Sequence, residues 1–179
     1  YIQDADAPCG IQVRSASVPG EGGRIAVAGT LRSDDSTGEL YIEAINWFRD
    51  GLQSVKPLGL NARSLGGSAF GTQSGVGGGG LNNIGMLVRL CGTIEAGSIE
   101  QGWACVNDGA SVTDPSGNTG VRIDLTGLGF SQRPPFAPGN KVTVTGISSV
   151  FSAPGGERFP MVRVRKSTDF RNLDGTDND

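Results

Sequence analysis

The sequence predicts an all-β protein composed of small antiparallel barrels, and three observations predict it. Apolar residues show no sustained helical periodicity over the 179 residues. The chain contains 30 glycines and 9 prolines, so turn-forming residues recur throughout it. Short alternating or β-branched runs lie between these turns. The second half has five such runs, as expected for one small closed barrel: 86–95, 102–107, 120–125, 141–147 and 159–165.

The first half repeats the last four of these runs in the same order. The residue numbers of matched segments differ by 104, 110, 117 and 120, and the difference grows only where the second copy has longer loops. Two copies of one structural unit produce such a pattern, and chance similarity between glycine-rich β segments is the alternative. The matches are Tyr1–Asp4 with Cys105–Asp108, Gly10–Val13 with Gly120–Ile123, Arg24–Gly29 with Lys141–Gly146, and Tyr41–Ile42 with Met161–Val162.

The first copy begins inside its second strand, because Tyr1 already aligns with Cys105. A barrel without its first strand has an edge of unpaired backbone groups and exposes apolar side chains. We therefore expect an incomplete N-terminal module in residues 1–46, a glycine-rich linker in 47–83, a complete module in 84–170 and an acidic tail in 171–179.

Four short segments of the second copy resemble the OB-fold modules of bacterial secreted proteins of mostly unassigned function. They are Gly85–Gly92, Val106–Gly109, Gly117–Arg122 and Gly139–Gly146, and Lys56–Gly67 is similar to the segment that joins two such modules. The resemblance implies two small OB-like barrels in tandem, the first lacking its own first strand, and implies no particular activity. The helix common between the third and fourth strands of such modules is not expected here, because residues 126–139 are rich in proline and glycine.

The three cysteines raise the question of a disulfide. A hairpin that turns around residues 96–100 would place Cys91 opposite Cys105, at the separation that a disulfide needs. We predict that bridge, with two buried free thiols as the alternative. Cys9 is then left over, either as an inert thiol or as an intermolecular cross-link. A disulfide implies an oxidising, extracellular location.

Three sources could close the incomplete first module. The missing strand could lie upstream, the linker could fold back, or a neighbouring subunit could supply a strand. Within this chain the candidate segment consists of Val55, Lys56, Pro57, Leu58 and Leu60, although the proline restricts it to an edge. The C-terminal residues 167–179 are a less favoured candidate, because their end is polar.

The glycine-rich residues 66–80 have two interpretations. Composition favours a flexible linker. Alternatively, the glycines allow backbone to pack closely against another surface, with Phe70 and Val76 as anchors.

OB-folds often bind oligosaccharides or single-stranded nucleic acid on the face of their second and third strands. On this face and on the last strand, the sequence offers Trp103, Arg122, Arg163 and Arg165 as candidate ligand-binding residues. The net charge of −3 and a pI of about 5.0 make nucleic acid an unfavoured partner.

Other classes of function find little support. Without histidine the chain lacks the usual general base and the commonest metal ligand, and no catalytic motif is present, so we expect no enzyme and no cofactor. Calcium is a minor alternative at the acidic tail or at Asp108, Asp114 and Asn118. No apolar run is long enough to span a membrane. We expect an extracellular structural protein that self-associates, as a polymer or filament subunit, through strand complementation.

Overall fold

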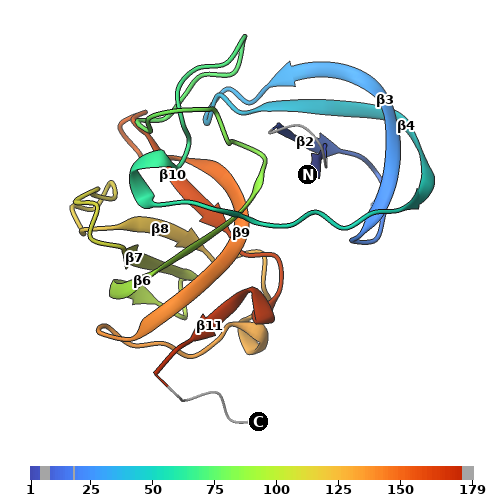
Figure 1. The fold of residues 1–179 in the computed structure, drawn as a ribbon. Helices are drawn as coiled ribbons and strands as arrows, with labels where there is room; N and C mark the ends of the chain where they lie inside the picture. The colour runs from blue at the N-terminus through green and yellow to red at the C-terminus, as the bar shows by residue number, and fades with distance from the viewer. Residues whose placement is uncertain (5–8, 18, 175–179) are drawn as a thin grey trace.

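The computed structural model describes residues 1–4, 9–17 and 19–174 (Figure 1). The regular secondary structure of these residues consists of strands and three single 3₁₀ turns, so the chain is all-β, as predicted. The strands form two sheets that lie side by side, a four-stranded N-terminal sheet and a larger C-terminal one that closes into a barrel (Figure 1). The 3₁₀ turns are η1 (Ala62–Ser64), η2 (Phe130–Gln132) and η3 (Ser167–Asp169).

Five strands of the C-terminal half form the closed barrel. Strands β6, β7 and β8 pair antiparallel in chain order, β8 pairs parallel with β10, β10 pairs antiparallel with β9, and β9 returns to β6. Two short strands, β5 (Leu58–Gly59) and β11 (Phe170–Asn172), flank β6 and β9. The barrel strands are β6 (Leu87–Ser98), β7 (Trp103–Asn107), β8 (Val121–Asp124), β9 (Lys141–Ser152) and β10 (Arg158–Arg163).

Alternate residues of these strands fill the barrel. Side chains of a strand alternate between its two faces, so an apolar residue at every second position places a continuous apolar surface inside the closed sheet. The interior residues are at most 2% exposed, and they include Val88, Leu90, Ile94, Val106, Val121, Ile123, Val142, Val144 and Val162.

The N-terminal sheet has the strand order β1-β2-β4-β3. Strand β1 pairs antiparallel with β2, β2 pairs parallel with β4, and β4 pairs antiparallel with β3. Strand β4 runs six residues beyond Asn46, so the linker begins later than the sequence predicts. The strands are β1 (Ile2–Gln3), β2 (Gly10–Arg14), β3 (Gly23–Ser33) and β4 (Leu40–Leu52).

The two sheets share the same pairing register. Ile2 pairs with Ile11 as Val106 pairs with Val121, and Gln12 pairs with Tyr41 as Arg122 pairs with Met161. These pairs are related by the offsets that match the two halves of the sequence. A Cβ on Gly29 would collide with the carbonyl of Glu43, and a Cβ on Gly146 would collide with the equivalent carbonyl of Arg163. The halves are therefore structural copies, with β1, β2, β3 and β4 equivalent to β7, β8, β9 and β10.

The glycine-rich segment is packed closely, as the second interpretation of its composition proposes. A Cβ on Gly67 would meet the backbone of Leu81, and a Cβ on Gly78 would meet the backbone of Leu65. Of the two proposed anchors, Val76 is 4% exposed, whereas Phe70 is 70% exposed. Glycine is required here because neighbouring backbone occupies the space of a side chain.

Candidate functional site

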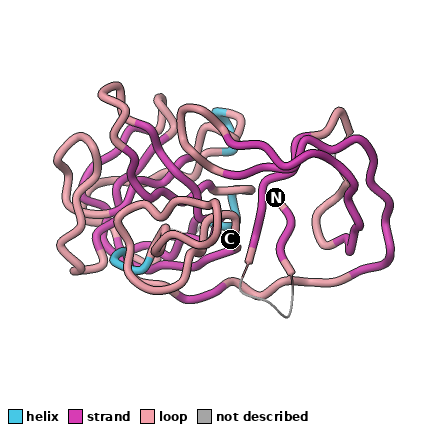
Figure 2. Tube along the Cα trace, turned by 90° about the horizontal axis from the view of Figure 1, so that it is seen from above, coloured by secondary structure: helices cyan, strands magenta, loops and turns pink. Residues whose placement is uncertain are grey.

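The N-terminal sheet is open where the barrel is closed. In the barrel, β6 lies between β7 and β9 and pairs with both. No strand in the described part of the chain takes the equivalent place between β1 and β3, so these are the outer strands of their sheet. Seen from above, the N-terminal sheet is a curved ribbon beside the barrel (Figure 2). The edge of β3 offers unpaired backbone groups to a further strand.

The inner face of this open sheet is apolar, like the interior of the barrel, but it is incompletely covered. The barrel residues Val106, Val121, Ile123, Val142, Val144 and Val162 are at most 1% exposed. Their equivalents are also apolar, but all are only half-buried: Ile2, Ile11, Val13, Ile25, Val27 and Ile42. Covering this face with a further strand would remove apolar surface from water, at about 25 cal/mol for each Å².

The free edge of β3 has few of the features that usually prevent strand pairing. Natural edge strands are often protected by proline, lysine or inward-pointing charges. The stretch from Ile25 to Leu31 contains none of these. The arginines that flank it are paired within the sheet, Arg24 with Asp50 and Arg32 with Glu43.

Both sequence candidates for closure pair with the barrel. Leu58–Gly59, from the segment that also contains Val55, Lys56, Pro57 and Leu60, pairs with Val88–Arg89 of β6. Phe170–Asn172, from the C-terminal candidate, pairs with Val142–Val144 of β9. As far as residue 174, where the described chain ends, neither segment pairs with the N-terminal sheet.

The predicted disulfide is wrong, because the cysteines are free. The hairpin turns at residues 99–102, not around 96–100, and this displacement shifts the pairing register of the two strands. Cys105 therefore lies opposite Ala96, and Cys91 lies opposite Thr143 of β9. Cys105 is buried, while Cys91 and Cys9 are exposed. Without the bridge, the disulfide argument for an oxidising location no longer applies.

A second site is a groove on the outer face of the barrel. It has a volume of about 420 Å³, and it brings together Trp103, Arg122 and Arg163 from the predicted ligand-binding set. The fourth member, Arg165, does not line this groove, and it pairs with Glu21 and Asp169.

Phe151 also lines the groove, and sequence reasoning missed it. The predicted strand covers 141–147, whereas β9 continues to Ser152. The Arg122 guanidinium lies between two rings, 4.7 Å from the Trp103 ring centroid and 4.5 Å from that of Phe151.

Acidic side chains accompany both arginines of the groove. Arg122 lies 3.9 Å from Asp114, and Arg163 lies 3.9 Å from Asp124. The groove is therefore polar and aromatic without a strong positive charge. In the N-terminal copy, the positions of Asp124 and Arg163 hold Arg14 and Glu43, so the signs of the charges are reversed.

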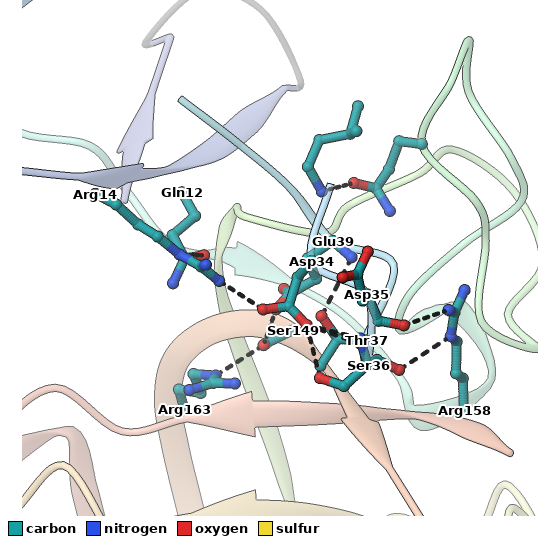
Figure 3. A network of polar contacts seen from close by, with 12 residues as sticks. Gln12, Arg14, Asp34, Asp35, Ser36, Thr37, Glu39, Ser149, Arg158 and Arg163 are labelled. Carbon is teal, nitrogen blue, oxygen red and sulfur yellow. Dashed lines mark hydrogen bonds and ion pairs between the residues drawn. The ribbon is translucent and has the colours of Figure 1, made fainter. Parts of the chain in front are cut away.

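A polar cluster joins the N-terminal sheet to the barrel (Figure 3). The turn between β3 and β4 places Glu39 against β9, where the Ser149 hydroxyl donates to Glu39 Oε2 at 3.0 Å. Arg163 Nε donates to the same Ser149 oxygen at 2.8 Å. Arg158 donates to the carbonyls of Asp35 and Ser36. These contacts fix the turn on the barrel.

The two carboxyls of this cluster differ in environment. Burial raises the pKa of Glu39, which is 2% exposed, and the Ser149 hydrogen bond and the Arg163 charge offset part of this effect. Glu39 Oε1 has no hydrogen-bond partner among the described residues. Hydrogen bonds from Ser36 and Arg14 instead hold the pKa of Asp34 well below its usual range.

We expect Glu39 to reduce stability as the pH rises above its usual pKa of 4.5. The folded chain keeps the Glu39 proton where the unfolded chain loses it, so this carboxyl favours folding most at low pH, and its contribution declines towards the raised pKa. The slope is at most about 1.4 kcal/mol for each pH unit. Denaturant unfolding between pH 5 and pH 8 measures it. Glu39→Gln should remove this part of the slope, and Glu157→Gln controls for net charge. An unchanged slope in Glu39→Gln would contradict the assignment.

No metal-binding group is evident in the described ranges, where no three Cys, Asp or Glu side chains cluster suitably. Asp108 and Asp114 accept hydrogen bonds from backbone amides two to four residues further along the chain, as turn residues do. Asp108 also accepts from the distant Ala62 amide at 2.6 Å. Residues 175–179 of the acidic tail lie outside the described chain. Nor does any helix in residues 1–4, 9–17 and 19–174 have the length and apolar character to span a membrane.

Comparison with known proteins gives no assignment. No family model matches the chain, and no curated protein is significantly similar to it. Its function therefore has to be argued from the two sites above.

Proposed function

We propose that this chain is a non-enzymatic, extracellular structural protein that self-associates, and that a neighbouring subunit supplies a strand to the open N-terminal sheet. Repeated contacts of this kind build polymers or filaments when they are heterologous, that is, when each contact joins two different surfaces of the subunit. The neighbouring subunit that supplies this strand is a second copy of this chain.

One observation carries the proposal. Six apolar positions that are almost completely covered in the barrel are only half-buried in its structural copy, beside the free edge of β3. A strand from a neighbour would gain backbone hydrogen bonds and apolar contacts together, which is the basis of β-augmentation. Its inward-facing side chains would cover the apolar face of the sheet, as Val88, Leu90 and Ile94 cover the interior of the barrel.

The repeat itself provides a test in which the sheet is closed within one chain. Tyr1 is equivalent to Cys105, so residues 83–104 placed directly before Tyr1 continue the pattern of the second copy without a gap in register. The unmodified chain should associate as its concentration rises, as measured by light scattering and electron microscopy. The extended chain should remain monomeric, because its added strand occupies the free edge.

A matched control uses the same extension with aspartate in place of the residues copied from Val88, Leu90 and Ile94. This extension cannot enter the apolar face, so association should persist. If the unmodified chain is monomeric at high concentration, or if both extensions leave association unchanged, the proposal is wrong.

The groove supports a second candidate function, the binding of an oligosaccharide or of single-stranded nucleic acid. The specific observation is the Arg122 guanidinium between the rings of Trp103 and Phe151 in a groove of about 420 Å³. Aromatic rings provide surfaces on which sugars or bases stack. Titration of tryptophan fluorescence in a Trp47→Phe variant, which leaves Trp103 as its single tryptophan, with mixed oligosaccharides, and with oligothymidylate at two salt concentrations, tests this candidate. Absence of saturable quenching by either probe would exclude it for those ligands.

A further inference from the structure

The free edge strand of the N-terminal sheet resembles the strand that its own sheet lacks. Strand β3 contains Ile25-Ala-Val-Ala-Gly-Thr-Leu31, and β6 contains Val88-Arg-Leu-Cys-Gly-Thr-Ile94. Both have apolar residues at alternate positions and a Gly-Thr pair at the same place. Side-chain period and the position of glycine determine which strands can lie side by side in register.

In the barrel, β6 pairs antiparallel with β9, and residue types on the two strands are nearly symmetric about the centre of the pairing. Leu90 lies opposite Val144 at the centre, Val88 lies opposite Gly146, and Gly92 lies opposite Val142. Each glycine thus faces a branched side chain of the partner strand. The pairing would be symmetric if the two sequences were the same.

Strand β3 corresponds to both strands of the β6–β9 pair. By position in its sheet it is equivalent to β9, with Ile25, Val27 and Gly29 in the places of Val142, Val144 and Gly146. By sequence it matches β6. A second copy of β3 placed where β6 lies against β9 then pairs Val27 with Val27, and Ile25 with Gly29. The register transferred from the barrel is therefore two-fold symmetric.

We propose that two copies of this chain associate through their β3 edges, as an antiparallel two-fold pair centred on Val27. This inference rests on the proposed function and identifies the partner at the open sheet. The partner strand keeps its own β4, so the two open sheets join edge to edge into one continuous sheet. Their half-buried apolar faces then lie on the same side of it.

Charge and side-chain size agree with this register. Residues 25–31 are uncharged, so no like charges meet at the centre of the pair. Arg24 falls opposite Thr30, and its guanidinium already pairs with Asp50 at 3.3 Å. The small Ala26 falls opposite Ala28. An isologous contact closes on itself, so a polymer needs a second contact, and β1 is the other outer strand of this sheet among the described residues.

A cysteine at the symmetry axis tests the pair. In a Cys9→Ser, Cys91→Ser background, Val27→Cys should form a covalent dimer with a short bifunctional thiol reagent, because directly opposite Cβ atoms lie about 5 Å apart. Leu31→Cys is the control on the same face. Its two copies would lie eight residue steps apart along the strands, about 27 Å, so it should not cross-link.

A second pair of variants does not depend on thiol chemistry. Val27→Lys places two ammonium groups opposite each other and should weaken association several-fold, whereas Leu31→Lys faces Gly23 and should weaken it less. If the chain associates but Val27→Cys does not cross-link and the two lysine variants behave alike, the two-fold pair is wrong and the proposed function stands. Cross-linking of both cysteine variants to the same extent also overturns the pair. If the chain never associates, both proposals fail.

Discussion

Replacement of Asn83 by alanine is expected to lower the free energy of unfolding by about 3 kcal/mol, because it leaves several buried polar groups without partners. Asn83 is 3% exposed. Its Oδ1 accepts from the Gly66 amide at 2.9 Å and from the Ser148 hydroxyl at 2.8 Å. Its Nδ2 donates to the carbonyls of Ser64 and Leu81. This single side chain holds the glycine-rich segment against β9.

Urea unfolding of the variant beside the unmodified chain measures this effect. The neighbouring Asn82→Ala serves as control, because Asn82 is less buried and its bond to the Ser68 carbonyl is exposed to water. We expect its effect to stay below about 1 kcal/mol. Equal losses in the two variants would show that the buried network is not the cause.

Equivalent valines of the two copies should differ strongly in their contribution to stability. Val144→Ala removes two methyl groups from the barrel interior, where the side chain is 0% exposed, and should destabilise by about 2 kcal/mol. The equivalent Val27→Ala, on the half-buried face, should cost less than about 1 kcal/mol in the monomer. The same chemical change thus measures how far each copy is closed.

Calorimetry or urea unfolding at low protein concentration tests this difference. Repeating Val27→Ala in the chain extended by residues 83–104 should raise its cost towards that of Val144→Ala, since the added strand covers the face. A large cost of Val27→Ala in the unextended monomer would mean that the N-terminal sheet is already covered.

The positions of the strands could be predicted because they follow from local patterns. Alternation located the strands, and the offsets between the halves indicated two copies of one unit. The equivalent pairings agree with these offsets, since Gln12 lies opposite Tyr41 where Arg122 lies opposite Met161. The groove was foreseen in part, since Trp103 and Arg122 were assigned to the second and third strands of the module, and these strands pair in the structure.

The failures concern features that depend on single turns or on distant contacts. A hairpin turn displaced by a few residues separated Cys91 from Cys105, because it placed Ala96 opposite Cys105. The buried position of Glu39 arises from the docking of the β3–β4 turn on β9, which no local pattern encodes. The close packing of Gly67 and Gly78 likewise depends on the fold, because composition alone is equally typical of a flexible linker.

The exchange of Asp124 and Arg163 for Arg14 and Glu43 has a consequence for recognition. An anionic group attracted to Arg163 would be repelled by Glu43 at the corresponding spot, so one molecule cannot be held alike by both halves. The two halves of this protein therefore share a backbone arrangement but present opposite charges at these two positions.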